Sequence, residues 1–168
     1  FDHFGGSLTP AAWRKLVHLI DAAETTWTQA DHGIWEPRIG VRHNVHSKLM
    51  NWLAADRGAR LAVAFGRTDL HTRWTALAHT IRQDIVDRGM DPSRRRFTSV
   101  YGEDRPDGTL LLLPVHGFLS DDDPRLAETV AWVRRELGTG PFIHRYRDAD
   151  GLTGGEGAFI LCGFWLAE

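Results

Sequence analysis

The stretch TPAAWRKLVHLIDAAETTW, residues 9–27, decides the fold class, because its pattern recurs along the chain. It begins with a hydroxyl cap followed by a proline at the first helical position, which is a typical helix start. Its apolar residues then recur with the period of a helix. They are Trp13, Leu16, Val17, Ile20, Ala23 and Trp27. The stretch therefore predicts a helix.

Similar patterns predict further helices, and few stretches alternate with the period of a strand. Gly66 and Gly89 follow two of these helices as stop signals. Three aspartates before Pro124 start another, since acidic side chains stabilise the positive end of the helix dipole. The last helix is apolar almost all round, as expected of a buried helix. These helices are expected at about 47–65, 70–89, 124–137 and 156–166. The predicted fold class is all-α, with strands minor at most.

Length and composition exclude several classes of protein. The 168 residues carry a net charge of −2 and form no long basic run, so no nucleic-acid partner is expected. No apolar run approaches the ~20 residues of a membrane span, and the first residues do not form a signal peptide. Cys162 is the single cysteine, which excludes an intrachain disulfide. We expect one unit over residues 1–168, without membrane association, in the cytoplasm.

Two glutamates in distinctive surroundings suggest chemistry. Glu36 lies in DHGIWEPR, residues 31–38, and Glu156 lies in GGEGAF, residues 154–159. Hydrolysis of a glycosidic bond commonly needs two carboxyl groups, one protonated and one ionised, on opposite sides of the bond. It also needs an aromatic surface for the sugar ring, and Trp35 directly precedes the first glutamate.

The local surroundings predict different roles for the two carboxyl groups. Glycines flank Glu156 and leave room for a ligand, and a position at a helix start would favour the anion, as a general base requires. Apolar neighbours surround Glu36 and would keep it protonated by desolvation, although Arg38 opposes this if it pairs with the carboxylate. The alternative is that Glu156 is a capping carboxylate and Glu36 a salt-bridge partner within a loop.

Other groups of residues that resemble catalytic or ligand-binding motifs are better explained by structural roles. His32, His43 and His46 lack a matching carboxylate pattern, so no metal site and no cofactor are expected. The pair Ser47-Lys48 suggests a nucleophile, but helix capping by Ser47 is the simpler interpretation. The aspartates 121–123 precede a proline and read as a cap and first turn rather than a calcium loop. The glycines 154–157 do not follow a strand, so they do not predict a nucleotide-binding loop.

Motifs along nearly the whole chain resemble the glucoamylase-like glycoside hydrolases of family 15, most of all the bacterial trehalase and glucoamylase-type members. Their order and combined extent carry the resemblance. The motifs are Asp31-x-Gly33-Ile34-Trp35-Glu36-x-Arg38, HSKLM at 46–50, Trp52-Leu53-Ala54-x-Asp56-Arg57, Tyr101-Gly102, residues 110–114, GFL at 117–119, Asp123-Pro124-Arg125, Arg145-Tyr146, GEGAF at 155–159 and FWL at 164–166.

This resemblance implies a fold, a reaction and site residues. The fold is part, roughly half, of an (α/α)6 toroid built of helical hairpins, without the N-terminal half and the last helices, and residues 110–113 form a short buried helix ending at Pro114. The reaction is hydrolysis of α-glucosidic bonds with inversion, on trehalose or α-linked glucose oligomers. Glu36 is then the general acid and Glu156 the general base. Trp35 borders the sugar subsite, Arg145 hydrogen-bonds the sugar, and Arg38 is a second candidate in that neighbourhood.

A second hypothesis belongs to another class. The chain would then be a non-catalytic helical fragment that binds carbohydrate or associates with a complementary chain. A half toroid would leave apolar helix faces exposed, and such faces favour self-association or binding of that chain.

Overall fold

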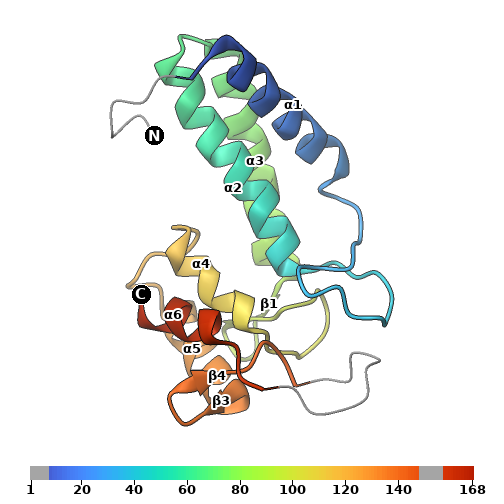
Figure 1. Cartoon of the computed structure of the whole chain (residues 1–168), viewed down its shortest axis with the longest axis vertical. Helices are drawn as coiled ribbons and strands as arrows, with labels where there is room; N and C mark the ends of the chain where they lie inside the picture. Colours follow the sequence, from blue (N-terminus) through green and yellow to red (C-terminus); the bar gives the residue numbers. More distant parts are fainter. Residues whose placement is uncertain (1–7, 148–156) are drawn as a thin grey trace.

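The computed structural model describes residues 8–147 and 157–168, and these residues are mainly helical (Figure 1). Three long helices lie in one half of the molecule, and shorter helices gather at the other end. The helices are α1 (Pro10–Thr26), α2 (Val45–Ala64), α3 (Thr68–Arg88), the 3-10 helix η2 (Gly108–Leu111), α4 (Leu112–Val115), α5 (Pro124–Leu137) and α6 (Ile160–Ala167). The predicted all-α class is confirmed.

Helix α1 begins as its sequence predicts. The Thr9 hydroxyl accepts a hydrogen bond from the Ala12 backbone N–H at 3.2 Å, and Pro10 occupies the first helical position. Ile20 and Ala23 are buried on the side that faces α2. At Gly58 of α2 the two helices approach so closely that an added Cβ would lie 2.2 Å from the Ile20 side chain.

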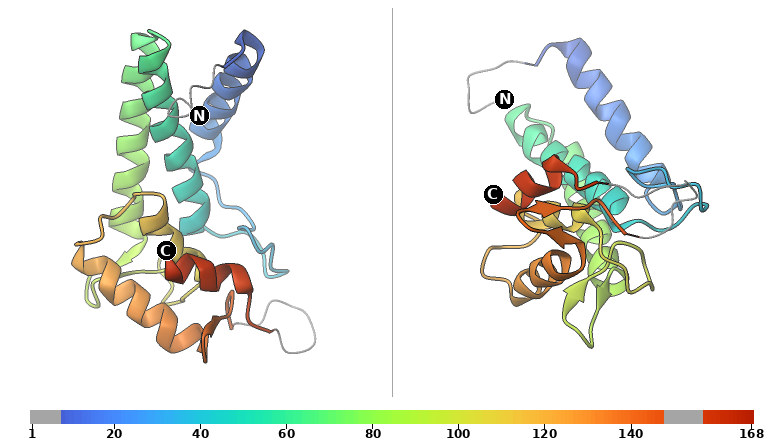
Figure 2. Two further views of the ribbon diagram at one scale, coloured as in Figure 1. Left: turned by 60° about the vertical axis from the view of Figure 1, so that its left-hand side comes forward. Right: turned by 60° about the horizontal axis from the view of Figure 1, so that its bottom comes forward.

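Helices α2 and α3 form an extensively packed hairpin, and they run side by side in both views of Figure 2. Gly66 turns the chain between them with a φ of +65°, a conformation that suits glycine. Trp74 and Ile81 of α3 are fully buried against this interface. Gly66 follows Phe65, the cap residue of α2, and Gly89 is the cap residue of α3. The predicted helix stops at Gly66 and Gly89 are therefore confirmed.

The start of α2 corrects one prediction. Ser47 does not cap the helix, because α2 begins two residues earlier at Val45. Pairing outside the helix fixes this start: Asn44 forms a bridge with Val100, and the Val45 N–H donates to the Ser99 carbonyl at 2.9 Å. Ser47 therefore lies in the first turn and uses its hydroxyl elsewhere.

Strands are short, as predicted. In the described ranges, β1 (Met90–Asp91) pairs antiparallel with β2 (Arg96–Phe97), and β3 (Gly138–Thr139) pairs antiparallel with β4 (Phe142–Ile143). Both pairs connect neighbouring helices and neither forms a layer of its own.

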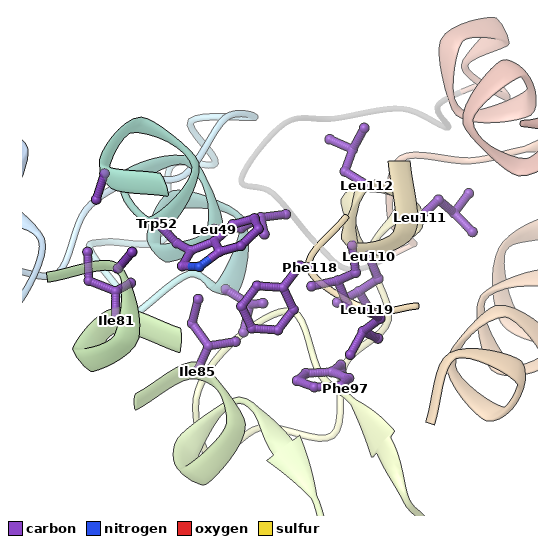
Figure 3. Close-up of a cluster of buried hydrophobic side chains, with 14 of the residues drawn as sticks. Leu49, Trp52, Ile81, Ile85, Phe97, Leu110, Leu111, Leu112, Phe118 and Leu119 are labelled. Carbon is purple, nitrogen blue, oxygen red and sulfur yellow. The ribbon is translucent and has the colours of Figure 1, made fainter. Parts of the chain in front are cut away.

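An aromatic and aliphatic core joins the α2–α3 hairpin to the shorter helices (Figure 3). The Phe118 ring packs edge-on against Trp52, with centroids 5.0 Å apart, and against Phe97 at 6.1 Å. The Arg82 guanidinium lies 4.5 Å from the Phe118 centroid and donates to the Phe118 carbonyl. Residues 110–113 are buried here in η2 and α4, so the predicted short buried helix is confirmed, with its end at Val115 rather than Pro114.

Helix α5 begins where the aspartates predict. The Asp123 carboxylate accepts from the Arg125 backbone N–H at 2.9 Å, and Pro124 is the first helical residue. Thr129, which is fully buried, accepts from the Phe97 backbone N–H at 3.0 Å and donates to the Arg125 carbonyl at 2.6 Å. This hydroxyl joins α5 to β2.

Helix α6 departs from its prediction in start and in burial. It begins at Ile160, four residues after the predicted start at Glu156, which itself lies outside the described residues. Only Cys162 is buried within α6, whereas Ile160 and Phe164 are 65% and 67% exposed. The helix packs against η2 and β4, and Ile160, Leu161 and Phe164 are exposed among the described residues. The apolar sequence therefore does not produce a buried helix here.

Over residues 8–147 and 157–168, no helix has both the length and the apolar character needed to cross a bilayer.

Candidate active site

Asp31 closes the loop that carries Glu36. Its backbone pairs with Arg42 in both directions, with N–O distances of 2.9 and 2.8 Å. Its carboxylate accepts from the Gly33 N–H at 2.6 Å and from the Ser47 hydroxyl at 2.8 Å. The Asn44 amide donates to the same carboxylate at 3.1 Å. Asn44 and Ser47, at the start of α2, thereby hold Asp31, and Asp31 holds Arg42 at the other end of the loop.

A buried lysine fixes the chain that leads into this loop. Lys48 of α2 is 1% exposed, and its ammonium group donates to the carbonyls of Trp27 and Gln29, which follow α1. Burial lowers the pKa of Lys48, while the Asp31 carboxylate favours its charged form. The ammonium group satisfies carbonyls that the helix end would otherwise leave unpaired.

Glu36 has an unusual backbone and an exposed side chain. Its φ is +47°, in the left-handed region that costs a non-glycine residue roughly 1–3 kcal/mol and that is enriched at active sites. The following Pro37 restricts its conformation further. The predicted desolvation by apolar neighbours is wrong, because Glu36 is exposed. Among the described residues no ion pair joins it to Arg38, which is also exposed.

Trp35 and Arg145, both predicted near the sugar, are brought together. The Arg145 guanidinium lies 5.0 Å from the centroid of the Trp35 ring. Phe159 packs edge-on against that ring at 5.6 Å, and Trp165 of α6 lies 6.5 Å away. Segments far apart in the sequence therefore meet around Trp35. Of the predicted site residues that the structure describes, Trp35 lines the adjacent cavity, whereas Glu36, Arg38 and Arg145 are not among its lining residues.

Asp107 is a component of this site to which sequence reasoning assigned no role. One carboxylate oxygen accepts from the Trp35 indole N–H at 2.8 Å, and the other accepts from the Thr109 backbone N–H at 2.6 Å. Burial raises the pKa of Asp107 to about 6, although these hydrogen bonds and the nearby Arg105 favour the anion. An aspartate directly before the first residue of a helix is a capping signal, but it does not reveal the Trp35 partner.

A small cavity opens beside Trp35, and part of it is open to solvent. Most of its walls come from the loop after α1 and from the segment before η2, and the start of α2 and the segment after β4 also contribute. The lining residues include Gly33, Trp35, Pro37, Arg42, His46, Asp107 and Tyr146. Burial and the neighbouring His116 lower the pKa of His46 to about 4, so this wall presents a neutral imidazole at neutral pH. The cavity offers aromatic, hydroxyl and charged groups at one surface, as carbohydrate recognition requires.

The spacing of the histidines predicts no metal site. Over the two described ranges, no three His, Cys, Asp or Glu side chains are grouped so that they could hold a metal ion. His43 instead stacks on Tyr101, with centroids 5.9 Å apart.

Residues 4–168 match the profile described as Glycosyl hydrolases family 15. The chain belongs to glycoside hydrolase family 15. The family resemblance seen in the motifs is therefore confirmed over nearly the whole chain.

Curated relatives in this family include proteins named trehalase. The chain is 41% identical over 159 residues to the trehalase of Mycobacterium tuberculosis, which covers 93% of this chain and 23% of that protein. It is 33% identical over 165 residues to the trehalase of Thermoplasma acidophilum, covering 98% of this chain and 28% of that protein. The chain thus spans about a quarter of the length of these relatives.

Solved glycosidase structures share the fold. A wild-type glycosidase aligns with a TM-score of 0.76 at 23% identity, over 88% of this chain and 38% of that chain. A glycosidase variant in complex with glucose aligns with the same TM-score at 22% identity. At this level of identity the likeness concerns the fold alone. The predicted fold, part of an (α/α)6 toroid built of helical hairpins, is confirmed.

Proposed function

We propose that this chain carries both catalytic carboxyl groups of a family 15 enzyme that hydrolyses α-glucosidic bonds with inversion. Glu36 protonates the departing glycosidic oxygen, and Glu156 activates the attacking water on the opposite face of the sugar. The observation that carries the proposal is the strained, exposed Glu36 directly beside the Trp35–Arg145 contact. The 168 residues act as one part of the catalytic domain.

The conformation of Glu36 supports its role as the acid. A left-handed backbone at a non-glycine residue before a proline lowers stability, so it persists only where the surroundings enforce it. The hydrogen bonds around Asp31 fix the ends of the loop and so provide such an enforcement. Glu36 is exposed, and its two neighbours in the chain, Trp35 and Pro37, line the adjacent cavity.

Trp35 and Arg145 support recognition of a sugar. An indole face packs against the apolar face of a pyranose, and a guanidinium donates several hydrogen bonds to hydroxyl oxygens. Trehalose is the first substrate to test, because the relatives at 41% and 33% identity are named trehalases. Oligomers of α-linked glucose are the second.

A glucose-release assay with trehalose tests the proposal. We expect Glu36→Gln and Glu156→Gln each to lower kcat at least roughly 100-fold, the usual contribution of general acid or base catalysis. Glu136→Gln is the matched control, since Glu136 is exposed on α5 and pairs with its neighbour Arg135. Activity that survives both changes would rule out the catalytic assignment.

An activated substrate separates the two roles. Fluoride leaves with little need for protonation, so Glu36→Gln should lose much less activity on α-glucosyl fluoride than on trehalose. Glu156→Gln should lose activity on both, because water must still be activated. Proton NMR should detect β-glucose as the first product of α-glucosyl fluoride, as inversion requires. If Glu156→Gln kept activity on α-glucosyl fluoride and Glu36→Gln lost it, Glu156 would be the acid and Glu36 the base.

The exposed apolar side of α6 favours a second candidate. Ile160, Leu161 and Phe164 present apolar surface on one short helix. We propose that this α6 surface binds the rest of a family 15 domain, which corresponds to the part of the relatives that this chain does not match. By itself, this chain would then be a non-catalytic fragment. Absence of glucose release from the unchanged chain, together with restored activity on adding that part, would favour this candidate.

A further inference from the structure

Asp107 links two segments that are 72 residues apart in the sequence, and its partners surround the candidate site. One oxygen accepts from the Trp35 indole N–H and the other from the Thr109 N–H, so both sides of the carboxylate are held. The adjacent Gly108 N–H donates to the Arg145 carbonyl at 2.8 Å. The three residues 107–109 therefore hold the side chain of Trp35 and the backbone of Arg145 at once.

The indole N–H is the single polar group of the Trp35 side chain, so its hydrogen bond decides the rotation of the ring. The same ring orientation presents one face to Arg145 at 5.0 Å and sets the Phe159 ring at 85° to the Trp35 ring. Loss of the acceptor would leave a partly buried donor without a partner and would remove one restraint on ring rotation.

We propose that Asp107 is a positioning residue that fixes the plane of the Trp35 ring, and through it the Arg145 guanidinium, at the sugar-binding surface. Its effect on catalysis rests on the proposed function, whereas its effect on the Trp35 ring does not. Asp107 does not touch the reacting atoms and acts through Trp35.

The charge state of Asp107 makes this positioning sensitive to pH. The groups that face it are the Trp35 indole, the Thr109 N–H and hydroxyl, the Arg105 guanidinium and the Cys162 thiol. Burial raises the pKa of Cys162 to about 12, so the thiol stays neutral. A carboxylate accepts hydrogen bonds more strongly than a carboxylic acid, so the bond to Trp35 should weaken as the pH falls through about 6.

The indole N–H signal of Trp35 in nitrogen-15 NMR tests this directly on the 168-residue chain, and Trp35→Phe identifies the signal by its loss. We expect the signal to shift with a midpoint well above the ordinary value for aspartate, and this titration to disappear in Asp107→Asn. In Asp107→Ala the N–H should exchange with solvent at least tenfold faster, since the acceptor is gone. If the Ala variant does not fold, the near-isosteric Asn variant carries the test.

Two outcomes would overturn the proposal: a titration that persists in Asp107→Asn, or an absence of any titration in the unchanged chain between pH 4 and 8. A steady-state assay tests whether Asp107 also affects catalysis. Asp107→Ala should lower kcat/KM roughly tenfold, mainly through KM. Asp107→Asn should restore part of that loss, because its single amide oxygen can accept from Trp35 while the Thr109 N–H then loses its acceptor. Failure of Asn to restore it would contradict positioning. A chain without any glycosidase activity would refute the proposed function, while the NMR titration would still decide the role of Asp107.

Discussion

Glu36 combines two properties that are unfavourable for stability and useful for catalysis. Its backbone lies in the left-handed region before a proline, and its carboxyl is exposed in a loop whose ends are fixed by hydrogen bonds to Asp31. Arg95, with a φ of +52°, shares the backbone conformation but lies in the turn between β1 and β2. Substitutions at Glu36 and at Arg95 can therefore be compared to separate the effect of backbone strain on stability from the effect on activity.

Glycine relieves this strain, because it adopts positive φ without a steric penalty. We expect both Glu36→Gly and Arg95→Gly to raise the free energy of unfolding, by up to about 1 kcal/mol in urea denaturation. Glucose release should be abolished by Glu36→Gly and unchanged by Arg95→Gly. A Glu36→Gly variant that retains full activity would show that the strained residue is not the acid.

Asp107 makes the free energy of unfolding depend on pH, and its raised pKa fixes the direction of that dependence. The folded value of about 6 exceeds the ordinary 3.8, so folding favours the protonated form. The contribution of Asp107 to stability is therefore greatest below about pH 4 and falls as the pH rises through 6. We expect Asp107→Asn to raise the free energy of unfolding at pH 8 by about 1 to 2 kcal/mol and to change it little at pH 4. Equal effects at both pH values would contradict this.

At the scale of elements, local sequence signals predicted the helices whose ends are set locally. Thr9 and Asp123 cap α1 and α5 as expected, since each cap needs only a side chain and a neighbouring backbone N–H. The start of α2 was missed because it depends on pairing of Asn44 with Val100, a contact between distant residues. The exposure of α6 was missed because an apolar sequence does not reveal which elements cover it.

The packing of α1 on α2 depends on a glycine. An added Cβ at Gly58 would lie 2.2 Å from Ile20 and 3.1 Å from Trp74, whereas at Gly163 of α6 it would meet nothing within 4 Å. We expect Gly58→Ala to lower the free energy of unfolding by about 1 to 3 kcal/mol through overpacking. Gly163→Ala should raise it by up to about 1 kcal/mol through helix propensity. Thermal unfolding compares the two; equal shifts would contradict close packing at Gly58.

At the scale of the whole molecule, sequence motifs located the site only in part. They selected Trp35, Glu36 and Arg145, and the structure brings Trp35 and Arg145 into contact. They assigned no role to Asp107, because its hydrogen bond to Trp35 joins residues 72 positions apart. Glu156 lies outside the described residues, so its position opposite Glu36 remains a prediction.

The α6 surface predicts how the whole molecule associates. Ile160 and Phe164 are strongly exposed on α6, whereas Leu19, 66% exposed, is the exposed large apolar residue of α1. If the α6 surface binds a partner, light scattering after size exclusion should detect a complex with the complementary family 15 segment. The change Ile160→Ser with Phe164→Ser should weaken it at least tenfold, and Leu19→Ser should not. Equal weakening by both would indicate nonspecific apolar association, and a complex of the chain with itself would identify a second copy as the occupant.

The distance between the Glu36 and Glu156 carboxyl groups tests the central claim most directly. It is best measured in a crystal structure of the chain with glucose bound. An inverting pair must leave room for a water molecule, so we predict a separation of roughly 6.5–9.5 Å, with the sugar between the two groups and beside Trp35. Carboxyl groups on opposite surfaces of the molecule, or in direct contact without space for water, would contradict the assignment.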